Sequence, residues 1–356
     1  MTPRAELWQQ LADAGLVDGP VPERSGPASP WFVRAMLGIA GWIGAIFLLG
    51  FVGVGLAFVF RNEATALLVG GLCCGAAYFI FARTRRNELA DQFGLAVSLA
   101  GQLLFIYGLH EAVVGSESSL FFLAVAVFEG ALAYLLNSFV HRVWSAFAAA
   151  TAFSFAMNMM VLHGAGTAVI GTALATIWLR EDLWATRGGF WRAIGWGLAF
   201  SFVQPMSYFS DIGRWAQPND PALPIAWIIW SKSILVAGVL LYVVYRLLER
   251  YGAQLSSTPS VSAFAVAAIT GAATLRAPGI VSSLIIVLLG FAAGNRALFG
   301  LGIAAMLSYL SYFYYSLHLT LLLKSFALAG TGVALIAMWV VSRVLFPARP
   351  EDRLRA

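Results

Sequence analysis

Long apolar runs, separated by short polar connections, alternate along most of the 356-residue chain. Runs of about 18 to 25 apolar residues are typical of helices that cross a membrane. We therefore predict an all-α membrane protein, a polytopic bundle of about twelve transmembrane helices with both termini in the cytoplasm. The predicted spans are Ala35–Phe60, Ala64–Ala82, Phe93–Leu109, Leu120–Leu136, Val143–Leu162, Gly164–Trp184, Ala193–Phe209, Ile225–Leu248, Val261–Thr274, Ile280–Gly294, Ala297–Leu317 and Thr320–Phe346.

Two short runs, Val261–Thr274 and Ile280–Gly294, leave the number of crossings open. Both are shorter than the roughly 20 residues with which a helix spans hydrocarbon. They form either two crossings or a re-entrant pair that is buried in protein, which would leave ten full crossings. Both numbers are even, so both place the two termini on the same side.

The ends of the chain differ from this apolar middle. Residues 1–30 are predicted to hold an amphipathic helix at Leu7–Val17, ending near Gly15, and a proline-rich linker at Gly19–Pro30. The helix either docks on the membrane domain or binds a partner. Residues 31–346 form the transmembrane domain, and residues 347–356 form a charged cytoplasmic tail.

Composition and charge agree with a membrane protein and orient it. Charged residues make up 11% of the chain and hydrophobic residues 60%, whereas soluble domains carry about 25% charged residues. The net charge of +5 comes with no nucleic-acid motif, so no nucleic-acid partner is expected. In the predicted topology the far side takes few of the 22 lysines and arginines, and the excess on the other side marks the cytoplasm. Those on the far side are Arg61, Arg214, Lys232, Arg276 and Lys324.

Motifs for catalysis and for ligand binding are missing from the sequence. There is no nucleophile elbow, zinc-protease helix, phosphate loop or dinucleotide-binding glycine pattern. The two cysteines, Cys73 and Cys74, are adjacent on a predicted helix and do not suit a disulfide. No spacing of histidine, cysteine or carboxylate residues indicates a metal site. We therefore expect no enzyme, no cofactor and no metal.

Ionisable residues inside the apolar runs are the candidate functional residues, because a charge in hydrocarbon is costly. Glu129 lies near the middle of its predicted span and either carries a proton or cation or fixes helix packing. Lys232 and Lys324, the only lysines, each start the string Lys-Ser-x-x-x-Ala-Gly near the outer start of a span. Each either snorkels to the outer headgroups or serves a site, and Lys232 has Glu129 as a possible partner. We expect all three on the same half of the bundle, with Glu129 deepest.

Weaker polar candidates are explained by packing. Gln102, Asn158 and Gln204 suit hydrogen bonds between helices, and Gln204-Pro205 is expected to kink its span. Gly71-Leu-Cys-Cys-Gly75 matches the GxxxG pattern of close helix contacts. The aromatic run Tyr309–Tyr315 is interpreted as part of an interfacial belt.

Two stretches of sequence resemble a known family. Trp31-Phe-Val-Arg34 leads into the glycine-rich first span, and the string Tyr314-Tyr315-x-Leu317-x-x-Thr320-Leu321-Leu322-x-Lys324-Ser325 lies near the other end. Together they resemble the bacterial multi-pass family catalogued as domain of unknown function 4401. The resemblance implies an uncharacterised inner-membrane protein. Members are often encoded beside another multi-pass protein and a small membrane-anchored protein with a Gly-Asp-Tyr motif, which implies a membrane complex.

Three functions remain as hypotheses. The first is a non-catalytic subunit of an envelope membrane complex, whose partners besides the lipid bilayer are neighbouring-gene membrane proteins. The second is a secondary transporter or proton-coupled exporter that uses Glu129; a Glu129 sealed in dry packing would count against it. An enzyme acting on lipid is the third, and no residue pattern requires it.

Overall fold

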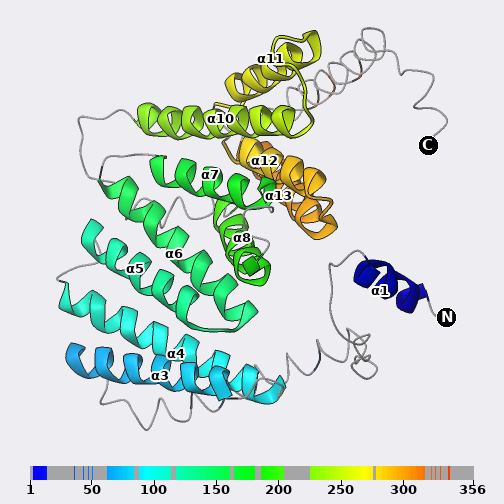
Figure 1. The fold of residues 1–356 in the computed structure, drawn as a ribbon. Helices are drawn as coiled ribbons and strands as arrows, with labels where there is room; N and C mark the ends of the chain where they lie inside the picture. Colours follow the sequence, from blue (N-terminus) through cyan, green and yellow to red (C-terminus); the bar gives the residue numbers. More distant parts are fainter. Residues whose placement is uncertain are drawn as a thin grey trace. The chain divides into compact units, whose positions relative to one another are not determined.

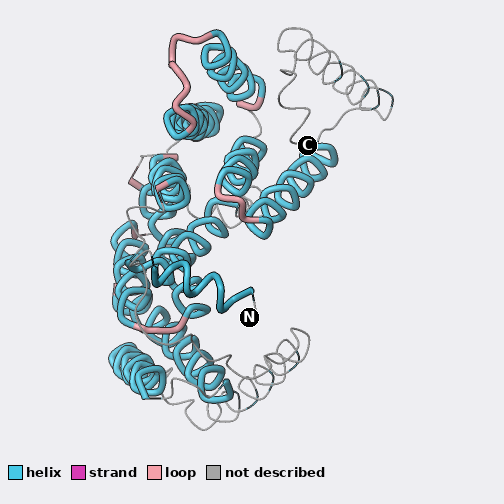
Figure 2. The backbone as a smooth tube through the Cα atoms, turned by 45° about the vertical axis from the view of Figure 1, so that its right-hand side comes forward, coloured by secondary structure: helices cyan, strands magenta, loops and turns pink. Residues whose placement is uncertain are grey.

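The computed structural model describes residues 3–13, 62–83, 88–113, 118–160, 164–180, 186–203, 225–275 and 278–316, with single positions at 36, 43, 47, 50, 322, 325, 329 and 336. Within these residues the chain is helical and contains no strand (Figure 2). The helices are α1 (Pro3–Asp13), α3 (Glu63–Arg83), α4 (Glu88–Ala112), α5 (Ser119–Leu135), α6 (Phe139–Met159), α7 (Ala165–Leu179), α8 (Gly188–Val203), α10 (Ile225–Arg250), α11 (Thr258–Ala273), α12 (Pro278–Ala292) and α13 (Arg296–Ser316).

Each predicted span from the second to the eleventh overlaps one of the helices α3 to α13. Three of these helices, at Glu63–Arg83, Ala90–Ala112 and Trp230–Arg250, are long and apolar enough to cross a membrane. Four shorter apolar helices of the described part are α5, α7, α11 and most of α12. The described part of the chain is therefore all-helical, and its three long apolar helices indicate a membrane protein. The first and twelfth predicted spans, the linker and the tail lie outside the described residues.

Several helix ends differ from the predicted ones for physical reasons. α4 begins at Glu88, five residues before its apolar run, because polar residues continue the helical hydrogen bonding. α8 is described as far as Val203, so the kink expected at Gln204-Pro205 lies outside the described residues. α1 starts four residues earlier than expected, with Pro3 in its first turn, a position that suits proline.

The described chain divides into two compact units, residues 1–105 and 106–356. In the first, α3 buries one stripe of residues, namely Ala66, Gly70, Cys74, Ala77 and Phe81. A Cβ at Gly70 would lie 2.6 Å from Phe105 N and 2.8 Å from Gly101 O, so backbone meets backbone here. Gly71 and Gly75, in contrast, face open space. The GxxxG pair thus makes no contact with α4, which packs on Gly70 instead.

The second unit is organised around α7. This short helix packs against α6, α8, α10 and α12, and Figure 1 shows it between α6 and α10. Its inward side chains include Leu174 and Trp178, which belong to one apolar core with residues of all four neighbours. Close approach again depends on glycine: a Cβ at Gly171 would lie 2.7 Å from the ring of Phe202 on α8.

Two antiparallel hairpins flank this core. The α5–α6 hairpin turns over residues 136–138, and the Ser118 side chain accepts a hydrogen bond from Leu120 N at the start of α5. In the α12–α13 hairpin, Gly294 has a positive φ of 62°, which is typical of a helix C-terminus. Asn295 then caps α13 by accepting hydrogen bonds from the backbone of its first turn.

The aromatic run has a tertiary role at its first residue. Tyr309 O–H donates to Val203 O at 2.9 Å and so joins α13 to the end of α8. Its ring covers Gly279 of α12, where any Cβ would overlap it. Other residues of the run are exposed, Leu310 and Tyr315 among them. Tyr309 therefore joins two helices within the protein, and the interpretation of the run as an interfacial belt stays a prediction.

Candidate functional site

Three polar side chains are buried at the interface of the α5–α6 hairpin. Glu129 on α5 is 1% exposed, and His141 and Ser145 on α6 are both 0% exposed. Ser145 forms a side-chain hydrogen bond with the Glu129 carboxyl. The second carboxyl oxygen, Oε2, has no hydrogen-bond partner among the described residues. We call these three residues the hairpin cluster.

The hairpin geometry explains why these residues meet. Glu129 lies seven residues before Leu136 and Ser145 seven residues after Ser138, so antiparallel pairing brings them level. His141 precedes Ser145 by one helical turn and lies on the same face. Sequence inspection missed both α6 residues, although a polar pair at this spacing inside an apolar helix is a recognisable signal.

Arg142 closes the turn end of the hairpin. Its Nε donates to Ala133 O at 3.3 Å, and its guanidinium carbon lies 5.0 Å from the centre of the Phe190 ring on α8. The Arg142 guanidinium therefore already contacts the Ala133 carbonyl and the Phe190 ring. The cluster offers a carboxyl, a hydroxyl and an imidazole, which can hold a proton. Among the described residues no group of three metal-ligating side chains is found.

Lys232 lies elsewhere, beside the start of α7. A Cβ at Gly164 would lie 2.5 Å from Lys232 Cα, and Gly164 itself has φ 83°. Gly164 follows the far end of α6, about 20 Å along that helix from Ser145. No ion pair joins Lys232 to Glu129 among the described residues. Pairing with Glu129, one of the alternatives for Lys232, is therefore not found, because the two groups lie near opposite ends of α6.

The Lys-Ser-x-x-x-Ala-Gly string on α10 serves helix packing. Ser233 O–H donates to Leu275 O, just after α11. A Cβ at Gly271 of α11 would lie 2.8 Å from Ala237 Cβ. The residues that follow Lys232 therefore hold α10 against α11. The second copy starts at Lys324, which lies outside the described residues.

Two of the weaker candidates have structural partners. Gln102 is buried, and its Nε2 donates to Ser98 Oγ at 3.4 Å within α4. Asn158 Oδ1 accepts a hydrogen bond from Gly164 N at 3.3 Å and so steadies the turn between α6 and α7. Gln204 and Lys324 both lie outside the described residues. The convergence expected for Glu129, Lys232 and Lys324 therefore stays a prediction for Lys324.

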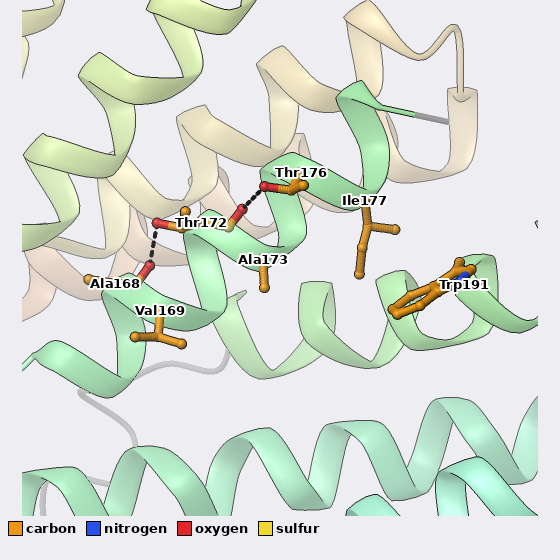
Figure 3. A pocket seen from close by; sticks show the side chains of 7 residues that line it. All are labelled: Ala168, Val169, Thr172, Ala173, Thr176, Ile177 and Trp191. Carbon is orange, nitrogen blue, oxygen red and sulfur yellow. Dashed lines mark hydrogen bonds between the residues drawn. The ribbon is translucent and has the colours of Figure 1, made fainter. Parts of the chain in front are cut away.

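A groove that sequence inspection did not anticipate runs along α7 (Figure 3). It has a volume of about 520 Å³. We call it the α7 groove. Its lining consists of Ala168, Val169, Thr172, Ala173, Thr176, Ile177 and Trp191. Small and threonine residues at a spacing of four on one helix face were the available signal, but such residues are frequent throughout the chain.

Comparison with known proteins identifies one match. The family model described as "Domain of unknown function (DUF4401)" matches residues 30–344. No curated protein and no solved structure matches the chain.

Proposed function

The chain belongs to the family described as "Domain of unknown function (DUF4401)", and we propose a function for it from its own geometry: a non-catalytic subunit of a membrane complex in the inner membrane of a bacterium. In this proposal about twelve helices cross the bilayer and both termini lie in the cytoplasm. The proposed partner is the multi-pass membrane protein encoded beside it.

The free glycine face of α3 carries this proposal. A Cβ at Gly70, one position before Gly71, would lie within 3 Å of the α4 backbone, whereas a Cβ at Gly71 or Gly75 would meet nothing within 4 Å. Each glycine in a helix costs about 0.5–1 kcal/mol relative to alanine. Lipid returns none of that cost, but close contact with another helix does. The exposed side chains Leu68 and Leu72 flank this face and offer packing surface beside the glycines.

Co-purification from native membranes tests the proposal. Full-length protein in a mild detergent is expected to bring down the neighbouring-gene protein. Gly75→Leu is expected to reduce that recovery, because a leucine fills the space a partner helix would use. Gly300→Leu, at a glycine of α13 where a Cβ would also meet nothing within 4 Å, is the matched control and retains the partner. Recovery of this chain alone, or equal recovery with Gly75→Leu, would count against the proposal.

The orientation is tested separately. Reporter fusions at each terminus, one active only in the cytoplasm and the other only outside it, are expected to place both ends in the cytoplasm. Opposite results for the two termini would rule out an even number of crossings.

A proton-coupled exporter that uses Glu129 is the second candidate. It is favoured by the buried carboxyl, whose Oε2 has no partner in the described residues, since buried polar groups of native proteins are generally satisfied. The near-complete burial of Glu129 counts against it, because a transported proton needs a route to each face.

Proton flux into liposomes separates the two candidates. A carrier is expected to acidify the lumen along an imposed proton gradient, and Glu129→Gln is expected to abolish this flux. Glu249→Gln, which alters an exposed carboxylate paired with Arg246, is the control. Flux no greater than in protein-free liposomes would leave the subunit role as the surviving proposal.

A further inference from the structure

The α7 groove has an apolar lining that suits a hydrocarbon ligand. The methyl groups of Val169 and Ala173 project into it beside Ile177 and the Trp191 ring (Figure 3). Thr172 O–H donates to Ala168 O at 2.8 Å, and Thr176 O–H donates to Thr172 O at 2.8 Å. The Thr176 hydroxyl also lies 3.4 Å from the Tyr242 hydroxyl. Each threonine proton is donated within the protein, so neither hydroxyl has a proton to offer a ligand, which suits a hydrocarbon occupant.

The length of the groove matches one leaflet of a bilayer. From Ala168 to Ile177 the helix rises by nine residues, about 14 Å. Half of the hydrocarbon thickness of a bilayer is about 15 Å. A single acyl chain lying along α7 would therefore reach from the headgroup level to the middle of the bilayer.

Ile177 and Trp191 form one end of the groove, and three arginines lie near these two residues in the chain. Arg180 is the C-cap of α7, and the exposed Arg187 and Arg192 lie just before and within the first turns of α8. The segment between α7 and α8 also contains Glu181 and Asp182 in its sequence. Selection of a negative headgroup is therefore assigned to Arg187 and Arg192, because Arg187 lies four residues before the groove residue Trp191, Arg192 is its neighbour in the chain, and both are exposed.

We propose that the α7 groove binds one acyl chain of an anionic phospholipid, whose phosphate lies at Arg187 and Arg192. In the proposed topology this end faces the cytoplasm, where the surface of the membrane is negative. The site is separate from the hairpin cluster and from the free glycine face of α3. It would give the protein a bound lipid of defined charge.

Photo-crosslinking tests the site in the full chain. Phosphatidylglycerol with a photoactivatable acyl chain is incorporated into vesicles with the protein, and cross-linked peptides are located by mass spectrometry. Labels are expected within 168–177 and at Trp191, and unlabelled phosphatidylglycerol is expected to compete better than phosphatidylcholine with the same chains. Each arginine contact is worth about a five-fold change in affinity, so at lipid concentrations well below saturation the double change Arg187→Gln and Arg192→Gln should reduce this labelling about 25-fold.

Filling the groove provides an independent arm. Ala173→Leu and Ala173→Trp are expected to reduce labelling by both lipids, while Val266→Trp, at an exposed position on α11, leaves it unchanged. Thermal unfolding of each purified variant confirms that it is folded. If Ala173→Trp does not fold, the labelling of Ala173→Leu is the test of the groove. Equal labelling of α7 and of the exposed face of α11 would overturn the proposal, as would equal competition by the two lipids. Partner co-purification is a separate measurement, so either result can fail alone.

Discussion

Gly70 and Gly71 are consecutive residues of α3 with opposite surroundings, and replacing each by alanine isolates the energy of one helix contact. At Gly70 the atoms nearest to a new Cβ belong to backbone, Phe105 N at 2.6 Å and Gly101 O at 2.8 Å. Backbone cannot rotate away, so α3 and α4 must separate. At Gly71 there is nothing within 4 Å.

The difference between the two variants measures overpacking alone. Both changes bring the same gain in helix propensity, about 0.5–1 kcal/mol, which cancels in the comparison. Overpacking of a close contact costs about 1–3 kcal/mol. Gly70→Ala is therefore expected to be less stable than Gly71→Ala by that amount.

The thiol of Cys74 reports this separation directly. Cys74 lies one turn from Gly70, is 5% exposed, and its Sγ is 3.9 Å from Ser98 O on α4. In a Cys73→Ala background, the rate of maleimide labelling in detergent should be roughly 5- to 150-fold higher in Gly70→Ala than in Gly71→Ala. Equal rates for the two variants, together with equal thermal unfolding midpoints, would refute the assignment of Gly70 to the contact.

Three further substitutions test contacts of the second unit by thermal unfolding in detergent. Tyr309→Phe removes the hydrogen bond to Val203 O and should lower the free energy of unfolding by about 0.5–1.5 kcal/mol. Ser145→Ala removes the partner of the buried Glu129 carboxyl, and leaving that group unsatisfied should cost about 1–3 kcal/mol. Gly290→Ala places a Cβ 2.4 Å from Phe299 N and should cost about 1–3 kcal/mol through overpacking of the α12–α13 hairpin.

Each of these changes has a matched control on an open position. Tyr315→Phe alters an exposed ring, Ser256→Ala an exposed serine, and Gly300→Ala a glycine with nothing within 4 Å. Each control should leave the unfolding midpoint unchanged or slightly higher. A control that destabilises as much as its partner would show that the loss does not come from the contact.

The amino-acid sequence by itself determined where most of the helices lie. An apolar run of sufficient length must satisfy its backbone hydrogen bonds internally, which only a helix does within one segment. For this reason each predicted span from Ala64 to Leu317 overlaps a helix of the structure. The polar first turn of α4 shows the limit, because hydropathy marks the part of a helix suited to lipid and not the whole helix.

Which face of each helix meets another was decided by the tertiary structure alone. In a soluble helix the apolar stripe marks the buried face, but helices suited to lipid are apolar all around, so that signal disappears. The sequence could not separate Gly70 from Gly71, assign Ser145 instead of Lys232 to Glu129, or tell that Tyr309 reaches Val203. The α7 groove likewise arises only where α7 and α8 leave space between small side chains, a matter of three-dimensional packing that no local pattern records.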